Sequence, residues 1–337
     1  MKYTMLLWPH SNVRYQNETL KLAAGELRIM LDACGHTAEI LPCEEINMPA
    51  LIIDTQTELE PRVLDAIAGH SLLYGLFELR ADGAMKPLLG REKAYVGADL
   101  AGILKYKGKT NELFLQMLVN VALYSGKYYD HADERIELLD PMCGRGTTLF
   151  IGANRGWNTT GGDVDKNDLR EAENFLKRYF EYHRMKHLMK RTSRTTGAGK
   201  SVPIVQFTFA DTPQRFKAGE TCMLQLANMD AAKVRDVFGK NRFHIIACDL
   251  PYGVQHGAVG GTPAQLLDRM LPAWRASLKC GGTVAVSFNA QTLKRDTVLE
   301  LMEKANLEPM RGGAYDAFEH WVEQAVTRDI AVGRWKG

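Results

Sequence analysis

The chain has 337 residues, which exceeds the usual size of one domain and favours about two. Apolar residues make up 45% and charged residues 24%, a balance that is typical of globular proteins and excludes disordered or fibrous ones. No stretch approaches the roughly 20 apolar residues of a membrane span, and the first residues lack a signal-peptide pattern, so we expect no membrane association. The six cysteines form no C-x-x-C pair, which favours a reducing cytoplasm over a disulfide framework.

The charges are unevenly distributed, although the net charge is only +2. Residues 1–100 contain 9 lysines and arginines against 14 acids, whereas residues 101–337 contain 33 against 26. The stretch 177–200 holds eight lysines and arginines and one acid, Glu181. Such a run is either a solvated helix face or a contact for an RNA backbone, made in the second case by Lys186, Lys190 and Arg191.

The first 80 residues predict the order strand, helix, strand, strand, helix, strand. Apolar runs predict strands at 2–8, 37–42, 50–54 and 71–79, and helical spacing predicts helices at 17–33 and from Pro61. This order is the ferredoxin-like split βαβ pattern. We therefore predict a ferredoxin-like α+β domain at residues 1–85, followed by a polar, glycine-containing linker at 86–110.

Residues 111–337 predict a Rossmann-like α/β domain. After a helix at 111–125, short apolar strands alternate with helices from Ile136, as in a parallel sheet with crossover helices. The strands are expected at 137–140, 159–163, 222–228, 244–249 and 282–288. Alternating polar and apolar residues at 320–326 and 329–334, around Thr327 and Arg328, predict a C-terminal antiparallel hairpin at one edge of the sheet.

A glycine-rich turn joins the first of these strands to a helix at 149–154. It reads Asp140-Pro141-Met142-Cys143-Gly144-Arg145-Gly146-Thr147-Thr148. The glycines let the backbone approach a ligand and set the helix N-terminus against it. A dinucleotide-binding turn would have a third glycine where Leu149 stands, and Asp140 would repel a pyrophosphate. The turn instead suits a ligand with an ammonium and a sulfonium group, as in S-adenosylmethionine.

Acids also follow the next two strands of the predicted sheet. Asp163 ends the strand at 159–163, where Rossmann sheets hold ribose hydroxyls, whereas Asp165 can cap the following helix. For the contact to an adenine amino group we favour Asp230, which follows 222–228, over Asp211, which follows 205–209. On that choice, residues 190–220 are an insertion.

The strand at 244–249 ends in the tetrapeptide Asp249-Leu250-Pro251-Tyr252. An amino nitrogen conjugated to a base ring is a poor nucleophile because its lone pair is delocalised. The Asp249 carboxylate and the Leu250 carbonyl would accept its two N–H bonds and stabilise the positive charge that grows on it. Pro251 would stiffen the turn and Tyr252 would stack on the extruded base. The tetrapeptide therefore predicts methylation of an exocyclic amine of a nucleobase.

Two other kinds of site find no support. Gly108-Lys109-Thr110 resembles the end of a P-loop, but the required earlier glycine position holds Ile103, and no strand precedes it. The nine histidines show no paired ligand spacing, so we expect no metal.

The motifs DPMCGRGTT, GGDVD and DLPYG together resemble those of the tRNA guanine-N2 methyltransferases, which are RNA methylases related to the THUMP-domain proteins. The resemblance covers roughly residues 90–337 and includes KYKGKTNELF at 105–114. It implies a class I methyltransferase sheet, S-adenosylmethionine as the cofactor, and methylation of guanine N2 in tRNA. The cofactor-binding residues that it implies are Asp140, Pro141, Cys143, Gly144, Gly146 and Thr147 at the turn, Asp163 at the ribose, Asp230 at the adenine, and Thr110 and Asn111 closing over the cofactor. The catalytic residues that it implies are Asp249, Leu250, Pro251 and Tyr252.

The N-terminus departs from that family, because residues 1–85 leave no room for a full THUMP domain beside a ferredoxin-like one. Ribosomal RNA is therefore an alternative substrate, and eukaryotic relatives suggest a small activator subunit as a partner. A DNA amino-methyltransferase is disfavoured because only 85 residues follow Tyr252. A non-catalytic RNA-binding subunit is disfavoured by the intact Asp249, Pro251 and Tyr252, and a small-molecule methyltransferase leaves 177–200 without a role.

Overall fold

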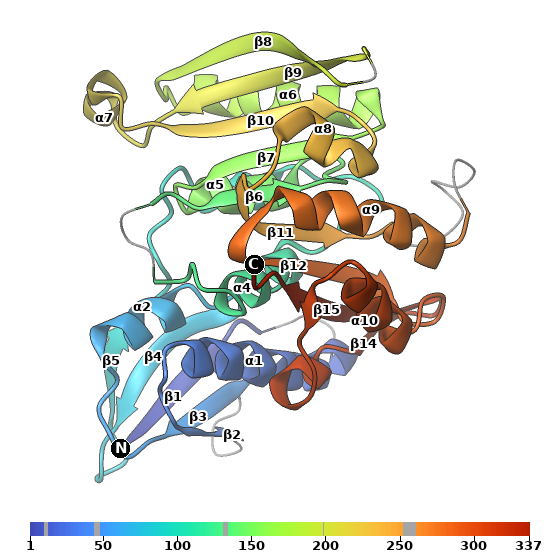
Figure 1. Ribbon diagram of the computed structural model, residues 1–337. Coiled ribbons are helices and arrows are strands. Elements are labelled where there is room, and N and C mark those ends of the chain that lie inside the picture. The colour runs from blue at the N-terminus through green and yellow to red at the C-terminus, as the bar shows by residue number, and fades with distance from the viewer. Residues whose placement is uncertain (10–12, 44–47, 131–133, 198, 252–260) are drawn as a thin grey trace.

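The chain forms two β-sheets with helices packed against them (Figure 1). The computed structural model describes residues 1–9, 13–43, 48–130, 134–197, 199–251 and 261–337. In Figure 1 the N-terminal unit, drawn in blue, lies against helix α4 (Glu112–Tyr124) and the C-terminal segments, drawn in red. None of the helices within these ranges combines the length and the apolar character that a membrane span requires.

In the described part of the chain, the N-terminal sheet has five strands in the order β2-β3-β1-β4-β5, and each neighbouring pair is antiparallel. The elements are β1 (Lys2–Leu7), α1 (Val13–Ala33), β2 (Glu39–Pro42), β3 (Ala50–Asp54), α2 (Pro61–Ala68), β4 (Leu73–Leu79) and β5 (Met85–Leu89). From β1 to β4 the order is βαββαβ, which is ferredoxin-like, as the sequence predicts. The segment 86–110 contains most of β5 and the short helix α3 (Leu100–Ile103). The exposed side chains of β5 give no apolar alternation from which this strand could be predicted.

The second sheet, counted over the same residues, has ten strands in the order β13-β15-β12-β11-β6-β7-β10-β9-β8, with β14 beside β15. Its parallel strands are β6 (Glu137–Asp140), β7 (Asn158–Asp163), β10 (Cys222–Asn228), β11 (Phe243–Asp249) and β12 (Leu278–Asn289). They are connected through α5 (Thr147–Asn154), α6 (Lys166–Tyr182), α8 (Val234–Phe238) and α9 (Pro263–Ser277). β7 lies on one side of β6 and β11 on the other, so the strand order reverses there. At such a switch point, α/β sheets bind ligands outside the carboxyl ends of the strands.

The parallel core and the antiparallel pair of C-terminal strands confirm the predicted Rossmann-like fold with a C-terminal hairpin. Both edges of the sheet are antiparallel. β15 (Val326–Arg334) pairs with β12, β13 (Glu308–Pro309) and β14 (His320–Glu323), and helix α10 (Arg295–Lys304) precedes β13. The hairpin turns before Val326 rather than at Thr327 and Arg328, because both continue the strand and Arg328 stands opposite Asn289.

The other edge is a hairpin of β8 (His187–Thr195) and β9 (Ser201–Phe209), followed by helix α7 (Pro213–Ala218). It occupies much of the insertion predicted at 190–220, but β8 itself was not predicted. Its lysines and arginines conceal the strand periodicity, and charged side chains are a common protection of edge strands.

A buried polar network fixes the N-terminal unit to α4. Glu26 of α1 is fully buried and accepts a hydrogen bond of 2.9 Å from the backbone N–H of Ser71. The Ser71 hydroxyl and the side-chain amide of Asn120, in α4, also donate to it. Asn120 donates a further bond of 2.9 Å to the carbonyl of Gly69. Because a buried carboxyl group is costly unless it is hydrogen-bonded, this network favours one arrangement of α1, the segment before β4, and α4.

Candidate active site

Three carboxylates lie at the carboxyl ends of neighbouring parallel strands. Asp163 ends β7, Asp140 ends β6 and Asp249 ends β11. Because β6 lies between the other two strands, these side chains gather at the switch point of the sheet. The structure therefore brings together three acids that the sequence assigns to one site.

Asp140 is the most deeply placed of the three, with 3% of its surface exposed. Burial, with smaller contributions from the neighbouring Asp163 and Asp249 carboxylates, raises the pKa of its carboxyl group to about 7. Hydrogen bonds from the Thr148 hydroxyl and from the Met142 N–H, at 3.1 Å, act in the opposite direction. A cation bound nearby would stabilise the ionised form of Asp140.

The glycine turn lies directly over β7. A Cβ atom on Gly161 would lie 2.6 Å from the Cys143 Sγ atom and 2.5 Å from the Leu149 side chain, so the close packing requires glycine. Gly146, with φ of 86°, precedes the first residue of α5. A Cβ atom on Gly144 would meet no atom within 4 Å, so the space beside Gly144 is open. Of the predicted cofactor residues in this turn, Gly144 is partly exposed, and the others are buried: Pro141, Cys143, Gly146 and Thr147.

Asp163 is held by two backbone N–H groups. Its carboxylate accepts hydrogen bonds from Gly144, at 2.8 Å, and from Asp165, at 2.9 Å. Burial raises the pKa of the Asp163 carboxyl group. Asp165 itself caps α6 by accepting from the N–H groups of Asn167 and Asp168, which is the alternative role considered from the sequence.

The two candidates for the adenine contact lie at opposite ends of the parallel strands. Asp230 follows β10, at the same carboxyl end as Asp140 and Asp163, and forms an ion pair of 2.9 Å with Arg269. β9 runs antiparallel to β10, so Asp211, which follows β9, lies at the amino end of the parallel strands and pairs with Arg215 at 2.9 Å. Only the placement of Asp230 is compatible with the carboxylate cluster.

Asp249 receives a hydroxyl donor on each carboxylate oxygen. Thr110 Oγ1 donates to Oδ2 at 2.5 Å, and Ser287 Oγ donates to Oδ1 at 2.7 Å. Leu250 is buried, its N–H donates to the Ser287 carbonyl at 2.9 Å, and Pro251 is partly exposed. The two hydroxyl donors fix the orientation of the Asp249 side chain. Tyr252, the last residue of the predicted tetrapeptide, lies outside the described residues.

Thr110 belongs to a segment that crosses over the glycine turn. Tyr106 packs against Arg145, whose guanidinium lies 4.6 Å from the ring centre and also pairs with Asp168 at 2.9 Å. Burial raises the pKa of the Tyr106 hydroxyl, which is hydrogen-bonded to Thr147. Asn111, the other residue predicted to close over the cofactor, caps α4 by accepting from the N–H groups that follow it.

Sequence reasoning missed Tyr106, Arg145 and Ser287 as parts of this site. Tyr106 and Arg145 lie within the quoted motifs, but nothing in their spacing distinguishes them from their neighbours. Ser287 stands opposite Asp249 in the parallel ladder of β11 and β12. The alignment of the two predicted strands could have identified it.

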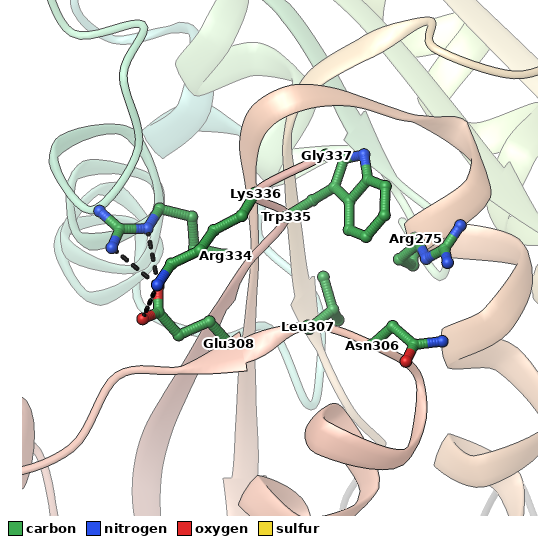
Figure 2. Close-up of a pocket in the computed structure, with 8 residues that line it drawn as sticks. All are labelled: Arg275, Asn306, Leu307, Glu308, Arg334, Trp335, Lys336 and Gly337. Atoms are coloured by element: carbon green, nitrogen blue, oxygen red, sulfur yellow. Dashed lines mark hydrogen bonds and ion pairs between the residues drawn. The ribbon is translucent and has the colours of Figure 1, made fainter.

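A separate cavity of about 540 Å³ lies near the amino-terminal end of β12 (Figure 2). Its lining includes Arg275, whose guanidinium stacks 4.0 Å from the ring centre of Trp335, and Glu308, which pairs with Arg334 at 2.7 Å. The carboxylates lie at the other end of the parallel strands, so this cavity is not part of the same site. Within the described ranges, no cluster of His, Cys, Asp and Glu side chains is arranged to hold a metal ion.

Residues 130–315, just over half of the chain, match the family model described as the RMKL-like methyltransferase domain. No curated protein matches the sequence. Similar solved structures include the rRNA methyltransferase aviRa from Streptomyces viridochromogenes, with 17% identity, 71% of this chain and 91% of the other covered, and a TM-score of 0.39. Magnesium protoporphyrin IX methyltransferase from Synechocystis, with bound S-adenosylmethionine, has 11% identity, coverage of 70% and 88%, and a TM-score of 0.41.

Proposed function

The chain belongs to the family of RMKL-like methyltransferase domains, and we propose that it methylates the exocyclic N2 amine of a guanine in RNA, with tRNA as the favoured substrate. It is a methyltransferase, and its cofactor is S-adenosylmethionine. The observation that carries the proposed target is Asp249, placed at the end of β11 beside Asp140 and followed by Leu250 and Pro251. Ribosomal RNA is the alternative substrate.

The residues at the glycine turn fit this cofactor. When bound, S-adenosylmethionine supplies a methyl group on a positively charged sulfur. The carboxylates of Asp140 and Asp163 favour a cationic ligand, and the open space beside Gly144 allows the ligand to approach the backbone. Each Asp163 oxygen accepts one backbone N–H and has a further lone pair for a ribose hydroxyl. We assign the adenine end to Asp230.

The target amine would donate its hydrogen bonds to the Asp249 carboxylate and the Leu250 carbonyl. These acceptors stabilise the positive charge that develops on the nitrogen during attack. Thr110 and Ser287 keep the carboxylate in one orientation, so little reorganisation is needed as the charge develops. Tyr252 would stack on the base, which has to leave its helix to reach this edge.

The RNA backbone would also contact the basic edge formed by β8. Lys186, Lys190 and Arg191 are all exposed, and Arg191 pairs with Glu173 of α6. β8 lies five strands away from β11 in the sheet, which corresponds to roughly 24 Å. We propose that this edge binds a part of the RNA that is distant from the methylated nucleotide.

The test is transfer of a labelled methyl group to separated tRNA, rRNA and DNA fractions, followed by nucleoside analysis. We expect N2-methylguanosine in tRNA; label in the same nucleoside of rRNA would change the substrate but not the reaction. N6-methyladenine in DNA, or no label in any fraction, would contradict the proposal.

A variant of Asp249 tests its assignment. Asp249→Ala should abolish transfer while leaving cofactor affinity nearly unchanged. Asp211→Ala removes a carboxylate at the opposite edge of the sheet and serves as the matched control. A large loss of cofactor affinity in Asp249→Ala would mean that β11 does not hold the target base.

A further inference from the structure

Trp8 and Tyr74 form an exposed aromatic pair on the N-terminal unit. The exposed fractions of their side chains are 40% and 50%. Their ring centres lie 5.1 Å apart with the rings perpendicular. Trp8 directly follows β1, and Tyr74 is the second residue of β4. The two strands are neighbours in the sheet, so the pair lies at the end of β1.

A β-bulge turns Tyr74 toward this surface. Leu6 of β1 stands opposite Gly75 and Leu7 opposite Leu73, so Tyr74 is the extra residue in β4. Bulges of this kind redirect a side chain and are over-represented at sheet edges and next to active sites. The backbone N–H of Trp8 donates to the Leu72 carbonyl at 2.9 Å, which holds the two segments together beyond the bulge.

Trp8 of this pair lies near the candidate active site. Trp8 and Leu72 line a small cavity, of about 40 Å³, together with Asn111 and Phe114 at the start of α4. Asn111 follows Thr110, whose hydroxyl donates to Asp249. A cavity of this size holds only a few water molecules and is too small for a nucleobase. A larger planar ligand would therefore lie on the outer faces of the two rings.

The chemistry of this surface matches a nucleobase of single-stranded RNA. Aromatic side chains bind unstacked bases through their π-faces, with little dependence on sequence. The segment that leads to Thr110 carries Lys105, whose side chain is 74% exposed and lies 4.0 Å from the Glu112 carboxylate, and the exposed Lys107. Their positive charges complement the phosphates on either side of a stacked base.

We propose that Trp8 and Tyr74 are a stacking site for a base that flanks the methylated nucleotide. This inference rests on the proposed function, because extruding the target base leaves its neighbours without a stacking partner. The aromatic pair replaces that partner and thereby offsets part of the cost of extrusion. The N-terminal unit is then a direct part of the RNA-binding surface, although its net charge is negative.

The experiment compares Trp8→Ala and Tyr74→Ala with Trp8→Phe, which retains a ring. The affinity for a short single-stranded RNA of mixed sequence and the KM for whole tRNA are measured for each. Stacking on one aromatic side chain contributes enough binding free energy that each alanine variant should lower the RNA affinity and raise the KM by about tenfold. Trp8→Phe should retain most of the affinity. Ultraviolet cross-linking of the same RNA should label the peptide that contains Trp8 or Tyr74. Trp335→Ala, at the distant cavity, is the control.

The outcomes separate the two proposals. If the wild-type protein methylates RNA and the alanine variants bind and methylate it equally well, the stacking site is wrong and the proposed function stands. If the wild-type protein methylates no RNA, the proposed function itself fails. A parallel loss of thermal stability and cofactor affinity in the alanine variants would assign the two rings a structural role and would also overturn the inference.

Discussion

Replacing Asp140 with asparagine should stabilise the protein and weaken its cofactor binding. The folded protein holds the Asp140 proton more tightly than the unfolded chain, because burial raises the pKa from its ordinary value of 3.8 to about 7. The folded state therefore binds more protons in this range, and this group costs stability as the pH rises from about 4 to about 7. Above that range the full difference corresponds to about 4 kcal/mol.

Asparagine keeps the shape of the side chain and removes this cost. Its Oδ1 atom can still accept from the Met142 N–H, and its amide can donate to the Thr148 hydroxyl. Urea unfolding in the absence of the cofactor should show a stability advantage of Asp140→Asn over wild type. The advantage should be small near pH 4.5 and should grow by about 3 kcal/mol by about pH 8.5.

Cofactor binding should change in the opposite direction. The ionised Asp140 attracts a cationic ligand, so the wild-type affinity for S-adenosylmethionine should rise as the pH increases through about 7. Asp140→Asn should bind more weakly and should lose this pH dependence in a calorimetric titration. A stability difference that is independent of pH would refute the reasoning, because it would show that the carboxyl group is not protonated in the folded protein.

The remaining predictions concern the orientation of Asp249 and the basic edge. Ser287→Ala and Thr110→Val each remove one hydroxyl donor to the Asp249 carboxylate. Either variant should lower kcat by about tenfold or more, because a hydrogen bond to a charged group contributes about 1.5–3 kcal/mol. Ser287→Ala should leave the cofactor affinity unchanged. An unchanged kcat in both variants would mean that the backbone alone positions Asp249. Replacing Lys186 and Lys190 with alanine should reduce the slope of log affinity against log salt for RNA by about 1.4. If the slope is the same as in the wild type, these lysines are only a solvated edge.

The parallel sheet and its acidic strand ends were predictable because they combine two strong signals. Buried strands give apolar runs, and Asp140 and Asp249 each follow such a run directly. Asp163 ends the buried but polar strand NTTGGD, and its place about one βα unit after the glycine turn indicates it instead. The choice between Asp230 and Asp211 was less secure, since both acids follow an apolar run. It depends on the direction of β9, and periodicity within one strand carries no information about its direction.

The parts that escaped prediction depend on contacts between distant segments. β8 carries charged residues because it lies at an edge, and its position is set by its pairing with β9. Ser287 contacts Asp249 through the register of two parallel strands, and Tyr106 meets Arg145 because residues 105–110 cross the glycine turn. No local pattern in the chain specifies either contact.

The buried network around Glu26 fixes the distance between the N-terminal unit and the candidate active site. Glu26, Ser71 and Asn120 hold the N-terminal unit against α4, and α4 begins directly after Thr110, which contacts Asp249. If Trp8 and Tyr74 bind a flanking base, its separation from the reacting amine is determined by the protein and not by the RNA. Nucleotides would then be selected partly by their spacing from a second contact, which needs no reading of base identity. Loosening the network, for example by Glu26→Gln, should therefore broaden the set of methylated positions before it reduces the rate at the preferred one.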